Sequence, residues 1–302
     1  MLHRPSRSRF LPLRGLRCHV REWGPVGAPM VVMLHGWMDV GASFQFVVDA
    51  LAAREGPSRY IVAGDWRGFG GSQSGPAGVA VDAFWVPDYL GDLDALLDAL
   101  SPGGPVDLLG HSMGGNVAMS YAGVRPQRVR RLANLEAFGM PATHPAQAPK
   151  RLSKWLDELK TPARLRDYAS LAEVAARLRQ NNPRMAQDRS LWLAAHWSVQ
   201  KADGRFHVLG DPAHKRTNPV LYHREEVVEC WRAITAPLLW VEGDATDVAK
   251  WWGNAYPRSD FESRLAVVPQ VERHVLADCG HMLHHDQPEA LAALLQAFLD
   301  RE

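Results

Sequence analysis

The segment GHSMG, residues 110–114, places a serine between two glycines. A mostly apolar segment, VDLL at residues 106–109, precedes it and predicts a buried strand, and residues 115–124 follow with a helical pattern. A serine at such a strand-to-helix turn sits on a sharp corner with its hydroxyl exposed, and glycines on both sides avoid clashes there. Ser112 is therefore the candidate nucleophile. The alternative interpretation is an ordinary glycine-rich turn with an incidental serine.

A serine hydroxyl is a poor nucleophile until a base removes its proton, and thirteen histidines are available for this role. His281 follows the last predicted strand, residues 273–278, and precedes the closing helix. A loop in this place can carry the imidazole over the sheet edge toward Ser112. His284 and His285 are nearby alternatives, which we interpret as structural residues.

Acyl transfer also needs hydrogen-bond donors for the oxyanion that develops on the substrate. The backbone N–H of Met113, at the start of the predicted helix, can supply one. The second is expected from the loop HGWMD that follows the apolar strand of residues 31–34. His35 and Gly36 would shape this loop, and the N–H of Trp37 would be the donor.

The elements around these residues alternate between short apolar strands and amphipathic helices, which predicts an α/β fold with a mostly parallel sheet flanked by helices. The alternation stops after residue 136 and resumes at residue 233. We therefore predict a core of residues 1–136 and 233–302, and a helical cap or lid of residues 137–232. An insertion of this length is too long for a plain loop, and after a strand's carboxyl end it would lie over the ligand crevice.

Four segments carry a resemblance to a known family: LHGWMDVGASF, GDWRGFGGS, GHSMGG and ADCGHMLHHDQPEAL, in this order. With them the chain resembles the α/β-hydrolase fold superfamily, and especially its serine-hydrolase-like branch. The resemblance covers the whole chain except the cap. It implies a Ser-His-acid triad, a cap inserted after the sixth strand, and a structural role for Asp65 and Arg67 in bracing the loop beside the site.

The acid of the triad is where this chain departs from the family pattern. In most relatives an Asp stands a few residues past the strand that here has the sequence PLLWVEG, and family spacing places it three residues after Gly243. That position is Thr246. Asp244 and Asp247 flank it, so a shift of one residue still supplies a carboxylate.

The superfamily also uses the end of the preceding core strand, where Glu136 stands in this chain. The placement is similar to that in haloalkane dehalogenases that take their acid from this strand, although their nucleophile is an aspartate. A capping or loop-fixing carboxylate is the alternative role. We predict Glu136 as the acid, then Asp247, then Asp244, with Glu242 last.

The cap is rich in tryptophan, and aromatic side chains often line apolar pockets. The alternative is that the indoles form the core of the cap itself. We expect a small-molecule acyl substrate with an apolar or aromatic group. The residues predicted to contact it are Trp37, His111, Trp192 and Trp197.

The predicted function is a serine hydrolase that cleaves a carboxylic ester or a related acyl compound through an acyl-enzyme. Hydrolysis of a C–C bond, a thioester or a lactone would use the same triad. Epoxide hydrolase and dehalogenase chemistry are disfavoured because they need a carboxylate at the position of Ser112. A non-catalytic ligand-binding module on the same scaffold is the alternative from another class.

The composition excludes several further functions. A formal net charge of +1 and the lack of a recognition motif argue against nucleic-acid binding. The sequence contains no run of 18 apolar residues, so it predicts no membrane span. Three scattered cysteines fit reduced thiols in a cytoplasmic protein. We expect no cofactor, and no metal because the adjacent histidines lack helical ligand spacing. The sequence is compatible with a homodimer.

Overall fold

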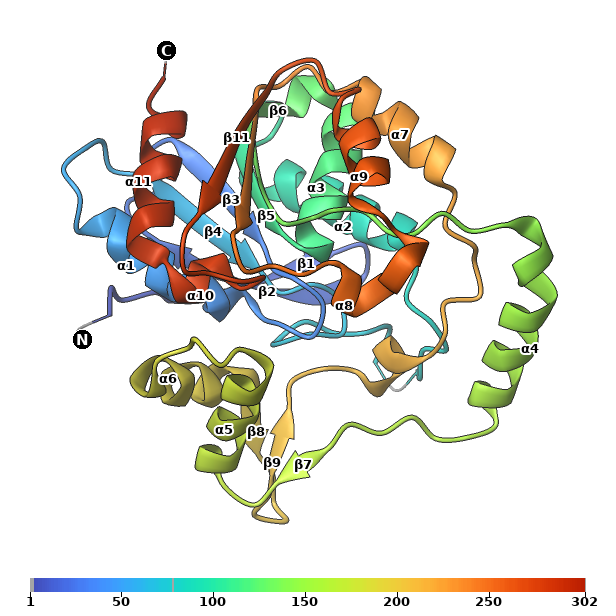
Figure 1. Cartoon of the computed structure of the whole chain (residues 1–302). Coiled ribbons are helices and arrows are strands. Elements are labelled where there is room, and N and C mark those ends of the chain that lie inside the picture. The colour runs from blue at the N-terminus through green and yellow to red at the C-terminus, as the bar shows by residue number, and fades with distance from the viewer. Residues whose placement is uncertain (1–2, 78, 302) are drawn as a thin grey trace.

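A computed structural model describes residues 3–77 and 79–301 of the chain (Figure 1). Its centre is an eight-stranded sheet with the order β1-β2-β4-β3-β5-β6-β10-β11. The strands are β1 (Arg7–Leu13), β2 (Leu16–Trp23), β3 (Met30–Leu34), β4 (Tyr60–Gly64), β5 (Val106–His111), β6 (Val129–Leu135), β10 (Leu238–Gly243) and β11 (Val271–Leu276). The β1–β2 and β2–β4 pairs are antiparallel, and the other pairs are parallel. The predicted mostly parallel sheet is confirmed.

Helices cover both faces of this sheet, and its central strands β3 and β5 are accordingly buried along almost their whole length. One apolar cluster joins the sheet to α2 (Val86–Leu100), α3 (Met113–Val124), α7 (Arg224–Arg232) and α9 (Arg258–Leu265). A second joins the opposite face to α1 (Gln45–Ala52), α10 (Leu283–Asp286) and α11 (Pro288–Leu299). The short elements η1 (Gly41–Phe44), η2 (Pro126–Arg128), α8 (Ala249–Trp252) and η5 (Gly253–Ala255) complete the core. No helix in the described ranges is both long and apolar enough to cross a bilayer.

The insertion between β6 and β10 is not exclusively helical. Its further elements are η3 (Pro145–Gln147), α4 (Ala148–Leu159), β7 (Asp167–Tyr168), α5 (Leu171–Asn181), α6 (Gln187–Trp197), β8 (Ser198–Gln200), β9 (Phe206–Val208) and η4 (Pro212–Lys215). The three strands form a small antiparallel sheet in the order β7-β9-β8. Strands of two or three residues are too short to show the alternation by which a sequence reveals a strand.

The two halves of this insertion are held differently. Helices α5 and α6 pack on each other around a third apolar cluster, which includes Val40 and Ala42 of the core. Helix α4 has no buried residue and stands apart in Figure 1. Its C-terminal turn is held by Glu158, whose carboxylate accepts hydrogen bonds from the backbone N–H and the hydroxyl of Thr217.

Candidate active site

Ser112 stands between the end of β5 and the start of α3, as the sequence predicts. Its φ of 50° and ψ of −117° lie outside the regions that non-glycine residues prefer, at a cost of roughly 1–3 kcal/mol. The neighbouring glycines make this corner sterically feasible. A Cβ on Gly114 would lie 2.2 Å from the carbonyl oxygen of Leu34, and one on Gly110 would lie 2.5 Å from the Cα of Gly115. The turn therefore holds Ser112 on a strained corner with no space for larger neighbours.

His281 and Glu136 form a hydrogen-bonded pair. The Nδ1 atom of His281 lies 2.8 Å from Oε2 of Glu136, whose side chain is fully buried. Glu136 follows β6 directly and has a φ of 56°, a left-handed conformation that turns its side chain out of the strand path. Because a carboxylate only accepts hydrogen bonds, this contact puts a proton on Nδ1 and leaves Nε2 free to act as a base.

The second oxygen of Glu136 is held by two donors at the end of β10. The backbone N–H of Gly243 and the hydroxyl of Thr246 each donate to Oε1 at 2.6 Å. Thr246 occupies the position where family spacing places an acid. In this chain that position supplies a donor to a carboxylate that comes from β6, so the orientation of Glu136 is fixed from both sides.

The other three candidate acids have different partners. Asp247 is exposed and accepts a hydrogen bond from the N–H of Ala249 at 3.0 Å. Asp244 is also exposed and accepts one from the N–H of Cys279 at 3.2 Å. Glu242 forms two contacts of 2.8 Å with Arg258. Of the four carboxylates, all in the described part of the chain, Glu136 alone is hydrogen-bonded to His281.

Two rings flank the imidazole of His281. The ring centroid of His111 lies 4.7 Å from that of His281, and the indole of Trp251, which the sequence did not single out as a site residue, lies 4.5 Å from it. Burial and the neighbouring histidines hold the pKa of His111 well below its usual value, so this ring is neutral. Its Nε2 donates to the carbonyl oxygen of His281 at 2.7 Å and fixes the backbone of the loop. His111 is thus placed to support His281.

The loop after β3 passes directly beside Ser112. A Cβ on Gly36 would lie 3.2 Å from the Cβ of Ser112, so the chain approaches the serine as closely as a glycine allows. The Nδ1–H of His35 donates to the carbonyl of Gly36 at 2.7 Å, while its Nε2 accepts the N–H of Trp66 at 3.0 Å. Burial lowers the pKa of His35, which suits this neutral ring. Trp37 comes next, with its indole about half exposed.

The two cap tryptophans occupy different environments. Trp197 is buried in the α5–α6 cluster, and its indole N–H donates to the carbonyl of Met38 at 2.8 Å. It therefore contacts the loop that carries Trp37. The ring of Trp192 lies 4.2 Å from His196 and 4.9 Å from His3, and so it packs against the N-terminal segment.

A cavity of about 570 Å³ lies between the β1–β2 turn, the loop before α2 and helix α4. Phe84, Trp85 and Trp155 form part of its apolar lining. Ser112, His281 and Glu136 are not among its lining residues, so this cavity is separate from the candidate site.

Comparison with known proteins places this geometry in a family. A model described as the alpha/beta hydrolase fold matches residues 29–288. The chain belongs to the alpha/beta hydrolase fold family.

Several relatives of this family span nearly the whole chain. A serine hydrolase-like protein of Danio rerio is 24% identical over 297 residues, which cover 92% of this chain and 83% of the relative. A 3-hydroxybutyrate-oligomer hydrolase of Cupriavidus necator is 30% identical and covers 93% of this chain and 92% of the relative. Among solved structures, the thioesterase domain from the curacin biosynthetic pathway superposes with a TM-score of 0.82 at 26% identity, covering 97% of this chain and 99% of that one.

Proposed function

We propose that this alpha/beta hydrolase cleaves acyl compounds through a triad of Ser112, His281 and Glu136. The observation that carries the proposal is the 2.8 Å hydrogen bond between Glu136 and His281, together with the two donors that hold the far oxygen of Glu136. Such an arrangement orients a histidine and stabilises the imidazolium that forms during acyl transfer.

In the proposed reaction, Ser112 Oγ attacks the substrate carbonyl while its proton passes to Nε2 of His281. The hydrogen bonds of the described residues include none between Ser112 Oγ and His281, and in free enzymes such a catalytic contact is often long and shortens when substrate binds. The N–H groups of Met113 and Trp37 receive the oxyanion. The imidazolium then gives its proton to the leaving group, and His281 activates a water molecule that releases the acyl group from Ser112.

For the substrate we propose an acyl compound with an apolar or aromatic group. The indole of Trp37 is about half exposed on the loop beside Ser112, and that of Trp251, also partly exposed, lies against His281. Two aromatic surfaces at the site favour such a group. A thioester or a C–C substrate is the second candidate, because the family relatives include a thioesterase domain and a 2-hydroxymuconate semialdehyde hydrolase of Pseudomonas putida, 25% identical over 98% of this chain.

A fluorophosphonate probe tests the nucleophile directly. We expect it to label the folded wild-type protein and to leave Ser112→Ala unlabelled, with mass spectrometry locating the adduct on Ser112. Folded protein that resists labelling would instead support a non-catalytic binding module.

A series of p-nitrophenyl esters of rising chain length tests the substrate class. We expect kcat/KM to rise with apolar chain length and to vanish in Ser112→Ala. Activity on acyl thioesters that exceeds activity on every matched ester would favour the second candidate.

A further inference from the structure

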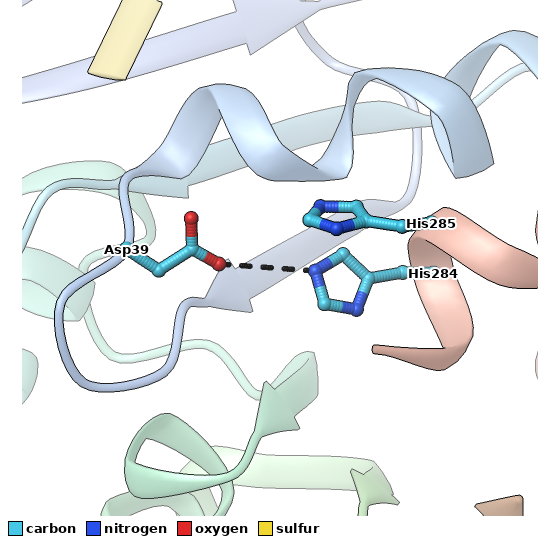
Figure 2. Close-up of side chains that lie close together, drawn as sticks. All are labelled: Asp39, His284 and His285. Atoms are coloured by element: carbon cyan, nitrogen blue, oxygen red, sulfur yellow. Dashed lines mark ion pairs between the residues drawn. The ribbon is translucent and has the colours of Figure 1, made fainter. Parts of the chain in front are cut away.

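Asp39, His284 and His285 form a buried cluster outside the proposed triad. Each offers one ligand atom, and these three atoms lie within 4.8 Å of one another. Figure 2 shows the carboxylate of Asp39, from the loop between β3 and η1, directed at the imidazoles that α10 presents. The histidines are 0% and 1% exposed and the aspartate 6%, so solvent does not satisfy these groups.

The cluster leaves polar atoms without partners. Oδ1 of Asp39 accepts the N–H of Val40, whereas Oδ2 accepts no hydrogen bond from any residue that the structure describes and lies 3.8 Å from Nε2 of His284. Within residues 3–77 and 79–301, the buried Nδ1 atoms of His284 and His285 also have no partner. A buried carboxylate oxygen without a hydrogen-bond donor calls for a donor or a cation beside it.

Ser43 satisfies the cluster only in part. Its hydroxyl lies 3.0 Å from Nε2 of His284 and 2.6 Å from Nε2 of His285. A hydroxyl has one proton to donate, so it donates to one of these nitrogens and accepts from the other. The single proton of Ser43 is therefore donated to one imidazole nitrogen, and Oδ2 of Asp39 receives no hydrogen bond from this hydroxyl.

We propose that Asp39, His284 and His285 bind a divalent transition-metal ion of the Zn²⁺ type. One carboxylate oxygen and two imidazole nitrogens are a donor set suited to Zn²⁺, Ni²⁺ or Cu²⁺, whereas Mg²⁺ and Ca²⁺ prefer oxygen ligands. Ligand atoms of a tetrahedral zinc site lie about 3.3 Å apart, since zinc–nitrogen bonds are about 2.0–2.1 Å long. The ligand atoms of this cluster lie within 4.8 Å of one another, so zinc binding requires their side chains to move closer together. Ser43 or a water molecule takes the fourth position.

The ion would join two segments that also support the proposed active site. Asp39 lies two residues after Trp37, and His284 lies three residues after His281. The rings of His284 and His111 are 4.5 Å apart, so the two sites are neighbours without shared ligands. The metal-site proposal is independent of the proposed serine-hydrolase activity, because the two sites share no residue. Because all three ligands are buried, uptake needs local opening and is expected to be slow.

The test is metal content and melting temperature of the whole protein after long incubation with ZnCl₂ and removal of free metal. We expect about one Zn²⁺ per chain and a higher Tm, because a ligand that binds the native state stabilises it. Asp39→Asn, His284→Gln and His285→Gln each remove a ligand. Each should weaken binding by more than the roughly 10- to 100-fold typical of losing an outer-shell partner.

Two variants serve as controls. Ser43→Ala breaks the hydrogen bonds to both imidazoles but keeps the three ligands, so it should still bind zinc. His207→Gln disrupts an exposed histidine–aspartate pair with Asp203 and should bind as the wild type does. If Asp39→Asn fails to fold, zinc binding by His284→Gln and His285→Gln tests the proposal instead. Absence of bound zinc in the wild type, or equal binding by the ligand variants, would overturn the proposal.

Discussion

Thr246 and Glu136 illustrate how a single side chain changes the interpretation of a motif. The sequence places a threonine where family spacing places an acid, with an aspartate on each side of it within two residues. The spacing alone left these aspartates as candidates. In space, the threonine hydroxyl and the Gly243 N–H hold Glu136 against His281, and this pairing comes from two strands that are neighbours in the sheet. No local sequence pattern encodes such a contact.

We expect Glu136→Gln to lower kcat by about 10³- to 10⁴-fold, with little change in the far-UV spectrum. An amide can turn a donor toward His281 and favour the wrong tautomer, which is the known cost of this change in a serine triad. In the opposite orientation the amide oxygen accepts from His281, and the NH₂ group then faces the two donors of Gly243 and Thr246. Steady-state kinetics on a p-nitrophenyl ester measure the effect.

Asp247→Asn is the matched control, because this exposed carboxylate only caps the turn at Ala249. Its kcat should stay within a few-fold of the wild type. If the control loses activity while Glu136→Gln keeps it, Asp247 is the acid.

At the scale of elements, the close approach of the start of α3 to the end of β3 depends on the absence of a side chain at residue 114. The helix starts so close to the strand that a Cβ would lie 2.2 Å from the Leu34 carbonyl, a backbone atom that cannot move alone. We expect Gly114→Ala to destabilise the fold by roughly 1–3 kcal/mol, the range for forced overpacking of a core. Urea denaturation measures this loss.

Gly64→Ala provides the comparison, since its Cβ would meet only Leu96 Cδ2 at an ordinary 3.4 Å. Its loss should be clearly smaller, about 1 kcal/mol or less. Equal losses in the two variants would mean that the approach of α3 to β3 is not the cause.

The elements also show which signals a sequence carries. Short apolar runs that alternate with helical segments predicted the sheet, because burial on both faces constrains every residue of a parallel strand. The strands β7, β8 and β9 were missed because two or three paired residues leave no periodic signal. The cluster of Asp39 and His284 was missed for a different reason. Its members are far apart in the chain and meet only when α10 packs beside the loop after β3.

The whole molecule should lose stability as the pH falls from about 7 to 5. Burial, together with neighbouring histidines, lowers the pKa of His111 and His285, and burial also lowers that of His35. These rings stay neutral in the folded state, whereas the unfolded chain takes up protons below about pH 6.5. The unfolded state therefore binds more protons, and each such histidine removes up to about 1.4 kcal/mol per pH unit.

Urea denaturation at pH 7.5, 6.5 and 5.5 measures this slope. Asp39 has a lowered pKa and adds to acid sensitivity only near pH 4 and below, so the histidines control this window. His111→Gln should flatten the slope. A stability that is constant between pH 7.5 and 5.5 would contradict the expectation.

The hydrogen bond from the Trp197 indole to the Met38 carbonyl has a consequence for protein engineering. Grafting the α5–α6 half of the cap from a relative is an attractive way to change substrate range. In this chain such a graft removes an anchor of the loop that carries Trp37, and it also removes the apolar cover of Val40 and Ala42. A successful chimera must therefore take residues 37–42 from the same relative as the grafted helices.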